Sequence, residues 1–210
     1  MTLFRLDASI LPGTSASTEL ADVVEREWAA TRSDTQVVRR HLGTDPLPAD
    51  AWAAATTAGF VPEADRTPAQ QDALALGATL SAELERADAV LLAVPLYNYG
   101  VSQHVKTWID LVIAGAGATN PILKDTPTVL ITVRGGSYGP GAAREGWDHS
   151  TGYLRRILGD LWQADLTVIE RELTLAAVNP AMESLRETAA RVHDEARAAA
   201  HDAGRALAER

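Results

Sequence analysis

A continuous apolar run at residues 89–94, Ala-Val-Leu-Leu-Ala-Val, constrains the fold of this chain more than any other stretch. Because no polar residue alternates with the apolar ones, a strand formed here buries both of its faces. Such strands are typical of parallel sheets that carry helices on both sides. The run therefore predicts the centre of a parallel sheet.

Strand-like and helix-like patterns alternate along the rest of the chain. Further strands are predicted at residues 2–8, 35–40, 128–133 and 166–170. Apolar residues at helical spacing predict helices that begin near Ser17 or Thr18, at Pro68, near Val101, around Tyr153 and after Pro180. The residues leave open whether a short helix forms around Trp52. Five strands alternating with helices predict an α/β sandwich of three layers, with helices on both faces of one parallel sheet.

Length and composition fit one globular domain over residues 1–210. Hydrophobic residues make up 46% of the chain and charged residues 22%, as in ordinary packed proteins. With 28 acidic and 19 basic residues the formal charge is -9, which repels nucleic acid and anionic membrane surfaces. We therefore expect neither nucleic acid nor membrane as a partner.

The chain contains no cysteine, which excludes disulfides, thiolate metal sites and iron–sulfur clusters. No group of His, Asp and Glu residues has metal-ligand spacing, so we expect no metal and infer that redox chemistry needs an organic cofactor. No apolar run approaches the ~18 residues that span a bilayer. Because Arg5 and Asp7 interrupt the first apolar stretch, unlike a signal peptide, we expect a cytoplasmic protein.

Three loops that follow predicted strands carry residues suited to a ligand. They occupy residues 9–17, 95–100 and 134–141. Ligands of open parallel sheets bind outside the carboxyl ends of the strands, at the point where the strand order reverses. We therefore expect the three loops to converge on one site.

The first loop is rich in hydroxyl groups, at Ser9, Thr14, Ser15 and Ser17, and it precedes a helix. Hydroxyls and backbone N–H groups at a helix start suit a phosphate. A serine-rich turn that only caps the helix is the alternative interpretation. The loop lacks the lysine of a P-loop and the glycine spacing of a dinucleotide fingerprint, which argues against nucleotide hydrolysis and a Rossmann site.

The other two loops suit a flat heterocycle. Tyr97 and Tyr99 flank Asn98, so that planar apolar surfaces lie beside an amide that both donates and accepts hydrogen bonds. The glycine pair at residues 135–136 lets backbone N–H groups approach a ligand closely, and Arg134 offers a positive charge there. The residues alone leave open that the tyrosines only cover the core and that the glycines form a surface turn.

Taken in order, the serine turn, the Pro-Leu-Tyr-Asn-Tyr loop at residues 95–99 and the Val-Arg-Gly-Gly stretch at residues 133–136 resemble the FMN-dependent NADH azoreductases and related flavodoxin-like quinone reductases. The resemblance covers nearly the whole chain. Its most specific part runs from Pro95 through Lys106 to the Asp-Leu-Val at residues 110–112, where the family has a Pro-Met-Tyr-Asn-Phe loop and a helix that ends in Asp-Leu-Val. The resemblance implies a flavodoxin-like fold with strand order 2-1-3-4-5.

The resemblance also implies which residues bind FMN. The phosphate is held by Ser9, Ser15, Ala16 and Ser17. The isoalloxazine ring lies along Leu96, Tyr97, Asn98 and Tyr99, with the Asn98 amide near the reactive N5, and its pyrimidine side is approached by Arg134, Gly135 and Gly136. Contacts of this kind stabilise the charge of a reduced flavin.

Two departures from the family pattern concern the substrate side. Between Val112 and Thr128 the chain has a short Ala/Gly segment, where the family has a longer excursion with an aromatic residue over the flavin. Conversely, residues 137–149 form a longer loop than in the family. This loop contains Tyr138, Trp147, Asp148 and His149, which are candidates to rebuild the roof, and Tyr138 and His149 are also the candidate proton donors.

The resemblance implies an FMN-dependent oxidoreductase that takes hydride from NADH or NADPH and passes two electrons to a quinone, azo or nitro compound by a ping-pong mechanism. It also implies a homodimer, because the family's site lies at a dimer interface. The sequence leaves open a flavoenzyme dedicated to one biosynthetic substrate, a flavodoxin-type electron carrier, and a relative of the fold that has lost its flavin. The identity of the electron acceptor does not follow from the residues.

Overall fold

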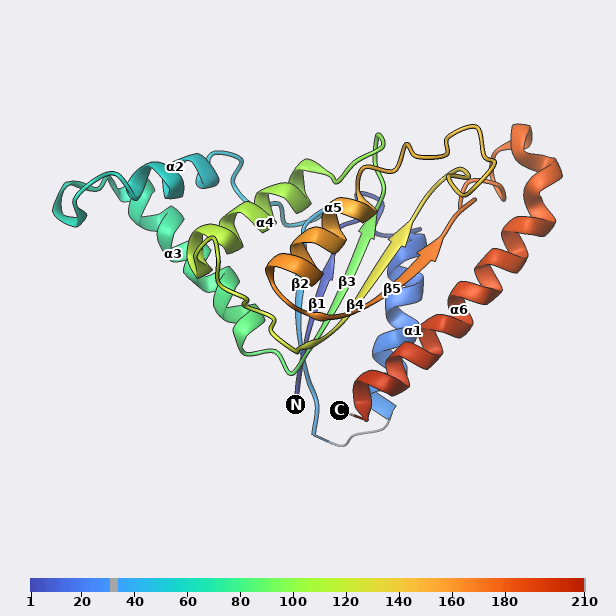
Figure 1. Cartoon of the computed structure of the whole chain (residues 1–210), viewed down its shortest axis with the longest axis horizontal. Helices are drawn as coiled ribbons and strands as arrows, with labels where there is room; N and C mark the ends of the chain where they lie inside the picture. Colours follow the sequence, from blue (N-terminus) through green and yellow to red (C-terminus); the bar gives the residue numbers. More distant parts are fainter. Residues whose placement is uncertain (31–33, 210) are drawn as a thin grey trace.

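One parallel sheet of five strands forms the centre of the molecule (Figure 1). The computed structural model describes residues 1–30 and 34–209. The strands lie in the order β2-β1-β3-β4-β5, and their bounds are β1 (Thr2–Asp7), β2 (Gln36–His41), β3 (Ala89–Pro95), β4 (Pro127–Val133) and β5 (Asp165–Arg171). The strand order and the parallel pairing are those predicted.

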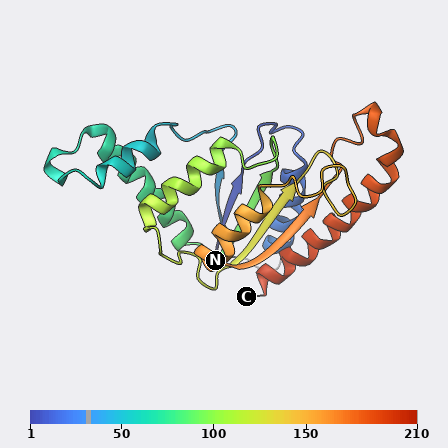
Figure 2. The ribbon, with the colours of Figure 1, turned by 45° about the horizontal axis from the view of Figure 1, so that its top comes forward.

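Six α-helices cover the two faces of the sheet within the described residues (Figures 1 and 2). Their bounds are α1 (Ala16–Ala30), α2 (Ala51–Ala58), α3 (Pro68–Glu85), α4 (Gln103–Ala116), α5 (Thr151–Arg155) and α6 (Arg186–Ala208). Helices α1 and α6 lie side by side on one face, and α2, α3, α4 and α5 lie on the other. This arrangement is the predicted three-layer, flavodoxin-like sandwich.

Short helices of other types complete the chain. They are the 3-10 helices η1 (Glu63–Asp65) and η3 (Pro180–Leu185) and the π-helix η2 (Arg156–Leu161). The sequence predicts one long terminal helix from Pro180, whereas the structure has η3, with non-helical backbone at Met182, before α6 begins at Arg186. The long terminal helix therefore begins at Arg186 and not directly after Pro180.

Strand β3 is buried along its whole length, as its apolar run predicts. Its side chains alternate between the two layers of the core. Val90, Leu92 and Val94 belong to the layer under α3 and α4, and Leu91 and Ala93 belong to the layer under α1 and α6. The strand is thus packed on both sides, and the loop that follows it starts from a buried position.

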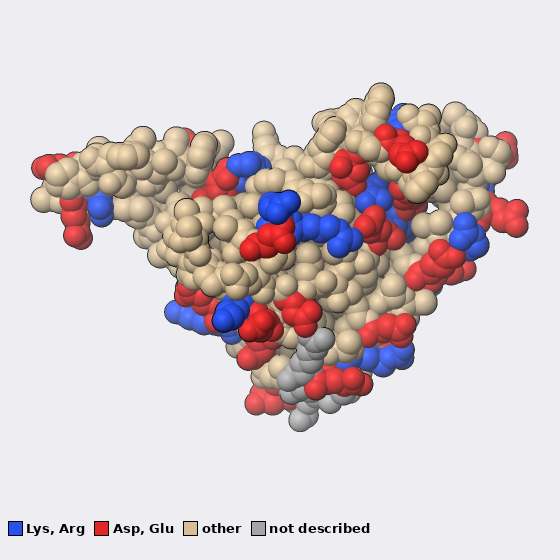
Figure 3. All heavy atoms as spheres, in the orientation of Figure 1, with Lys and Arg blue, Asp and Glu red and all other residues tan. Residues whose placement is uncertain are grey.

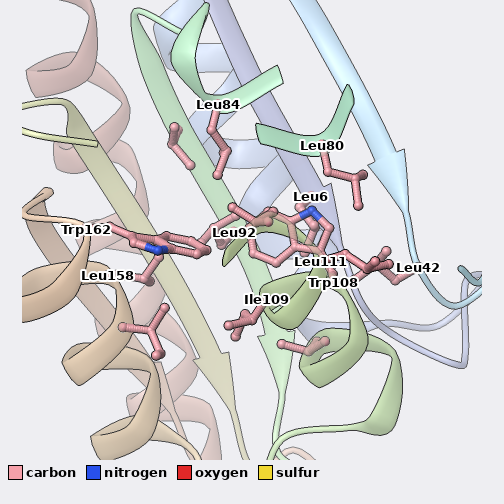
Figure 4. Packing of buried hydrophobic residues seen from close by; sticks show 14 of the residues in the cluster. Leu6, Leu42, Leu80, Leu84, Leu92, Trp108, Ile109, Leu111, Leu158 and Trp162 are labelled. Carbon is pink, nitrogen blue, oxygen red and sulfur yellow. The ribbon is translucent and has the colours of Figure 1, made fainter. Parts of the chain in front are cut away.

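Three aromatic rings pack together in the layer under α3 and α4, and Figure 4 labels two of them, Trp108 and Trp162. Phe4 of β1 stacks on Trp108 of α4 with ring centroids 6.3 Å apart, and Trp108 meets Trp162 edge-on at 5.7 Å. Aromatic pairs in these geometries contribute stability beyond the burial of their area. The rings tie β1, α4 and the end of η2 to one face of the sheet.

Two charged residues of β1, Arg5 and Asp7, are buried in the sheet, with 4% and 5% of their surface exposed. Arg5 Nε lies 2.8 Å from Asp7 Oδ2, and Arg5 Nη1 lies 2.9 Å from Glu25 Oε2. Burial opposes the charge, but the hydrogen bonds and charges of these carboxylates outweigh it and raise the Arg5 pKa. Because the Thr18 hydroxyl donates to Asp7 at 3.0 Å, this cluster joins both ends of the loop between β1 and α1.

Side chains of both charges are interspersed over the face that Figure 3 shows. Many form pairs within one helix, such as Lys106 with Asp110 and Arg191 with Glu195. Exposed pairs of this kind each contribute little stability. Among the described residues, no helix combines the length and the apolar character needed to cross a membrane.

Helices α3 and α4 approach closely at a pair of glycines, Gly77 and Gly115. A Cβ atom built on Gly115 would lie 2.1 Å from the carbonyl oxygen of Gly77. Backbone atoms cannot give way as the end of a flexible side chain does, so a larger residue at this position separates the helices. The packing of α3 against α4 therefore requires glycine at position 115.

We predict that Gly115→Ala lowers the free energy of unfolding by about 1–3 kcal/mol, because the added methyl group forces the two helices apart. Urea denaturation followed by circular dichroism measures the change. Gly152→Ala is the matched control, since it adds the same methyl group to α5, where nothing in the described chain lies within 4 Å. Equal unfolding midpoints for the two variants would contradict the requirement for glycine.

Candidate functional site

The loops after β1, β3, β4 and β5 surround a pocket of about 470 Å³ at the carboxyl edge of the sheet, the edge that comes forward in Figure 2. We call it the loop pocket. Six residues predicted to bind the cofactor line it: Ser9, Ser15, Ala16, Leu96, Tyr97 and Gly135. The loop after β5 adds Thr174, Leu175 and Val178. The structure thus brings the three predicted loops together and adds a fourth.

The turn before α1 presents a row of unsatisfied donors. The backbone N–H groups of Ser15, Ala16 and Ser17 donate to no acceptor in the part of the chain that the structure describes. The hydroxyls of Ser15 and Ser17 lie 3.0 Å apart, and Ser15 Oγ accepts from the Thr18 N–H at 3.2 Å. Free N–H groups and ordered hydroxyls at a helix N-terminus fit a phosphate group.

The guanidinium of Arg171, for which the sequence predicts no role in the site, lies beside this turn. Arg171, the last residue of β5, lines a second cavity of about 470 Å³ together with Ser15. Its Nη1 lies 2.9 Å from Glu19 Oε2, and the other oxygen of Glu19 lies 2.7 Å from His193 Nε2. Burial raises the Glu19 pKa, but the hydrogen bonds and charges of these two partners outweigh burial and hold it below its usual value. Strand β5 therefore places a guanidinium beside the serine turn, where Glu19 is its ion-pair partner.

Residues 97–100 form a tight turn with a strained backbone, here called the tyrosine turn. The Tyr97 N–H donates to the Gly100 carbonyl at 3.2 Å, and the Gly100 N–H donates back at 3.0 Å. Between them Asn98 and Tyr99 have φ angles of 47° and 69°. Two successive left-handed residues are typical of a type I′ turn, which is costly without glycine. The N–H groups of Asn98 and Tyr99 find no acceptor among the described residues and stay available to a ligand.

The Tyr97 side chain joins this turn to the first loop. Its hydroxyl accepts from the Ile10 N–H at 3.1 Å and lies 3.4 Å from Ser9 Oγ. On the other side, the Leu96 N–H donates to the Val133 carbonyl at 2.9 Å and so continues the pairing of β3 with β4. The turn is therefore held from both sides of the pocket.

The loop that contains Gly135 and Gly136, here called the glycine loop, packs against the segment after β5, which the sequence does not predict as part of the site. The Leu175 N–H donates to the Gly135 carbonyl at 3.2 Å, and the Leu173 N–H donates to the Gly136 carbonyl at 3.1 Å. A Cβ atom built on Gly135 would lie 2.7 Å from Leu175 Cδ1, so glycine permits this approach. The rule that places ligands at the carboxyl ends of strands also applies to β5 and is the signal that identifies residues 173–178.

Arg134, predicted to approach the cofactor, lies beneath the glycine loop and is not among the described residues that line the loop pocket. Only 7% of its surface is exposed. Its guanidinium contacts Asp148 at 2.7 Å, Glu170 at 2.5 Å and Glu172 at 3.1 Å. Burial alone lowers the Arg134 pKa, but the hydrogen bonds and negative charges of Glu170 and Asp148 have the larger combined effect and raise it. The geometry gives Arg134 the role of holding the loop in place.

The same ion-pair network holds both ends of residues 137–149. Glu172 accepts from the Tyr138 N–H at 2.9 Å, and Asp148 accepts from the Thr151 N–H at 2.9 Å. Burial raises the Asp148 pKa, but hydrogen bonds from the start of α5 and the nearby guanidinium outweigh burial and keep it below its usual value. The long loop therefore leaves and rejoins the sheet at two anchored points.

Aromatic rings of this loop and of the turn at residues 97–100 form a roof beside the loop pocket. The Tyr99 ring meets the Trp147 ring edge-on at 5.5 Å between centroids and the Tyr138 ring at 6.4 Å. Below it is a cavity of about 850 Å³, here called the roof cavity. Its lining includes Tyr99, Gly135, Gly136, Trp147 and Leu175. Gly135 and Leu175 also line the loop pocket, so the two spaces adjoin.

The candidate proton donors Tyr138 and His149 each contact Tyr99, which lines the roof cavity. His149 is exposed and its N–H donates to the Tyr99 carbonyl at 2.9 Å, whereas Tyr138 is half-buried. Neither is among the described residues that line the loop pocket or the roof cavity. Of the other predicted residues, Ser17 is fully buried beneath the serine turn and Asn98 is exposed at the tip of its turn.

Comparison with known proteins identifies the family of this chain. Residues 1–198 match the family described as having a flavodoxin-like fold, and the chain belongs to that family. A protein of Streptomyces avermitilis is 40% identical over 209 residues, which cover 96% of each chain. One of Kineococcus radiotolerans is 40% identical over 214 residues, covering 98% of this chain and 99% of that protein. Both relatives are named FMN-dependent NADH:quinone oxidoreductase, which confirms the family predicted from the sequence.

Solved structures share the fold. An azoreductase from Bacillus anthracis has a TM-score of 0.75 at 19% identity, covering 97% of this chain and 98% of that one. An FMN-dependent NADH-azoreductase of the same species, in complex with FMN, has a TM-score of 0.69 at 16% identity, covering 95% of this chain and 99% of that one. At these identities the likeness concerns the fold alone.

We predict that Arg134→Met lowers the free energy of unfolding by about 3 kcal/mol, because it leaves partly buried carboxylates without their cation. Arg155→Met is the matched control. Arg155 pairs with the same Glu170 at 3.3 Å, but 52% of its side chain is exposed, so its loss should cost less than about 1 kcal/mol. Urea denaturation at neutral pH compares the variants, and equal losses would refute the anchoring role of Arg134.

Proposed function

We propose that this chain is an FMN-dependent oxidoreductase that takes hydride from NADH or NADPH and passes two electrons to a quinone, azo or nitro compound in a ping-pong cycle. The observation that carries the proposal is the loop pocket. Ser15 and Ala16, whose N–H groups find no acceptor among the described residues, line it together with Tyr97 and Gly135. The names of the relatives support the same activity.

FMN fits the donors that the chain provides. Ser15, Ala16 and Ser17 would hold the phosphate through N–H groups and hydroxyls, with Ser9 alongside. The isoalloxazine ring would then lie against residues 96–99 and the glycine loop. When bound, FMN supplies a ring that accepts a hydride and releases two electrons. Residues 1–210 then form one FMN-binding domain.

The chain itself contributes orientation and charge stabilisation. The N–H groups of residues 98–99 and 135–136 find no acceptor in the described part of the chain, and they suit negative charge that develops on a reduced ring. Because Tyr138 and His149 line neither space, we propose that water delivers the proton to the acceptor and that these two residues act only at the rim. No side chain of the loop pocket has to act as a general acid or base.

Two other functions would use the same site. A flavoenzyme dedicated to one biosynthetic substrate would hold that substrate in the roof cavity, so the shape of this cavity decides between a broad and a narrow acceptor range. A flavodoxin-type carrier keeps its flavin edge exposed for protein partners. The roof of Tyr99 and Trp147 beside a cavity of about 850 Å³ favours a small-molecule acceptor instead.

We expect the purified protein with FMN to show a flavin absorption band that bleaches on anaerobic addition of NADH or NADPH and returns when menadione is added. Stopped-flow absorption follows each half-reaction alone, because a ping-pong cycle separates them. A band that neither nicotinamide bleaches, in a protein that exchanges electrons with a reductase, indicates the carrier instead. A protein that does not quench FMN fluorescence has lost the cofactor.

A variant of the serine turn tests the phosphate site in the same protein. Ser15→Asp places a carboxylate at the proposed phosphate position and should weaken FMN affinity at least about tenfold through charge repulsion. Stability should hold, because an acidic residue suits a helix N-terminus. The control Ser102→Asp makes the same change at the start of α4, outside the loop pocket. Equal FMN affinity in both variants would mean that the phosphate binds elsewhere.

We further propose that the protein is a cytoplasmic homodimer with the site at its interface, as in the family that the sequence resembles. Apolar side chains that line the loop pocket are exposed at its mouth: Leu11, Leu175 and Val178 are 59%, 49% and 75% exposed. Exposed apolar groups that gather in one place are typical of interfaces. Their position supports a partner subunit over the pocket.

We expect sedimentation velocity to give twice the chain mass of 22.4 kDa, and Val178→Asp to shift the protein toward the monomer, because a charge at an apolar interface is costly. Phe60→Asp is the control, since Phe60 is 86% exposed and lies at the end of α2, away from the pocket. A wild-type monomer at micromolar concentration would refute the dimer.

A further inference from the structure

The roof cavity has one charged side chain, Arg144, among the described residues that line it. The rest of its lining is aromatic, aliphatic, small or neutral. Its large apolar members are Tyr99, Trp147, Leu175, Met182 and Leu185. Apolar walls with a few polar groups are typical of small-molecule sites, in which the polar groups fix orientation and selectivity. In this cavity, that role falls mainly to Arg144.

The Arg144 guanidinium is free to bind a ligand. It has no ion pair and no side-chain hydrogen bond within residues 1–30 and 34–209. It lies over the glycine loop, since a Cβ atom built on Gly136 would be 2.8 Å from Arg144 Nη1. The neighbouring carboxylates have other partners: Glu145 accepts from the Gly141 N–H at 2.8 Å, and Glu172 is bound to Arg134.

We propose that Arg144 makes the roof cavity selective for planar aromatic acceptors that carry an anionic group, such as a sulfonate or a carboxylate. The ring of the acceptor would lie against the apolar walls, close to the loop pocket that Gly135 shares. The anionic group would receive two parallel hydrogen bonds from the guanidinium, a geometry that a lysine cannot provide. The reduction of such an acceptor rests on the proposed function, whereas its binding does not.

The charge of the whole protein opposes this preference only weakly. The formal charge of -9 repels anions at long range, but at physiological salt such fields decay over about 8 Å. A contact between a guanidinium and an anion acts at hydrogen-bond distance and is about twice as strong as a neutral hydrogen bond. The local contact therefore dominates inside the cavity.

Steady-state kinetics of the FMN-loaded enzyme with NADH test the selectivity. The acceptors are 1,2-naphthoquinone-4-sulfonate and its neutral parent 1,2-naphthoquinone. We expect Arg144→Gln to raise KM for the sulfonate about tenfold with little change in kcat, and to leave the neutral quinone unchanged. Arg144→Lys should keep part of the preference, because it keeps the charge but not the fork. Arg197→Gln removes one exposed charge from α6 and should change neither acceptor.

A binding experiment separates this inference from the proposed activity. Naphthalene-2-sulfonate accepts no electrons from the enzyme, so its calorimetric Kd for the oxidised, FMN-loaded protein does not depend on turnover. We expect Arg144→Gln to weaken this binding about tenfold, and high salt to narrow the difference. If NADH fails to bleach the flavin but the tenfold difference remains, the activity is refuted and the selectivity stands.

Two results would overturn the selectivity. Equal affinity of the wild-type protein and Arg144→Gln for naphthalene-2-sulfonate would show that the guanidinium does not bind the anion, even in an active enzyme. An equal loss of activity toward the sulfonated and the neutral quinone would show that Arg144 only shapes the cavity. The ratio between the two acceptors is decisive, because a purely structural role moves both together.

Discussion

Strand β3 has to bury both of its faces, and the arrangement of the molecule follows from that requirement. Helices must cover each face, so a helical connection links each strand to the next and loops follow the strand ends. The tyrosine turn starts from this most constrained strand, and the Leu96 N–H extends the pairing beyond it to the Val133 carbonyl. A backbone held so firmly can keep Asn98 and Tyr99 in costly left-handed conformations.

Much of the fold can be predicted from the sequence, because burial and periodicity are local signals. The apolar run of β3 and the proline that opens α3 mark elements that the structure places within two residues of the prediction. The meeting of Ser15, Tyr97 and Gly135 in one pocket follows from the rule about strand ends. The strand order does not follow from periodicity and comes instead from the family resemblance.

The remaining features depend on residues that are far apart in the chain. Arg134 follows a strand, and its side chain turns away from the pocket because Glu172, 38 positions later, arrives beneath the loop. Arg5 looks like an interruption of an apolar strand because nothing beside it shows that Glu25 will compensate its charge. Leu175 lies in a loop without a motif, so only the end of β5 points to it. In each case the tertiary partner decides the role.

Because residues 137–149 are anchored at both ends, this segment can change in evolution independently of the rest of the site. Glu172 and Asp148 tie this segment to the guanidinium of Arg134, and the stretch between the anchors adds no strand or long helix to the core. Such an insert can change in length and composition without displacing the serine turn or the tyrosine turn. A lineage with this scaffold can therefore adapt to new electron acceptors by changing one surface segment, while the two turns are inherited unchanged.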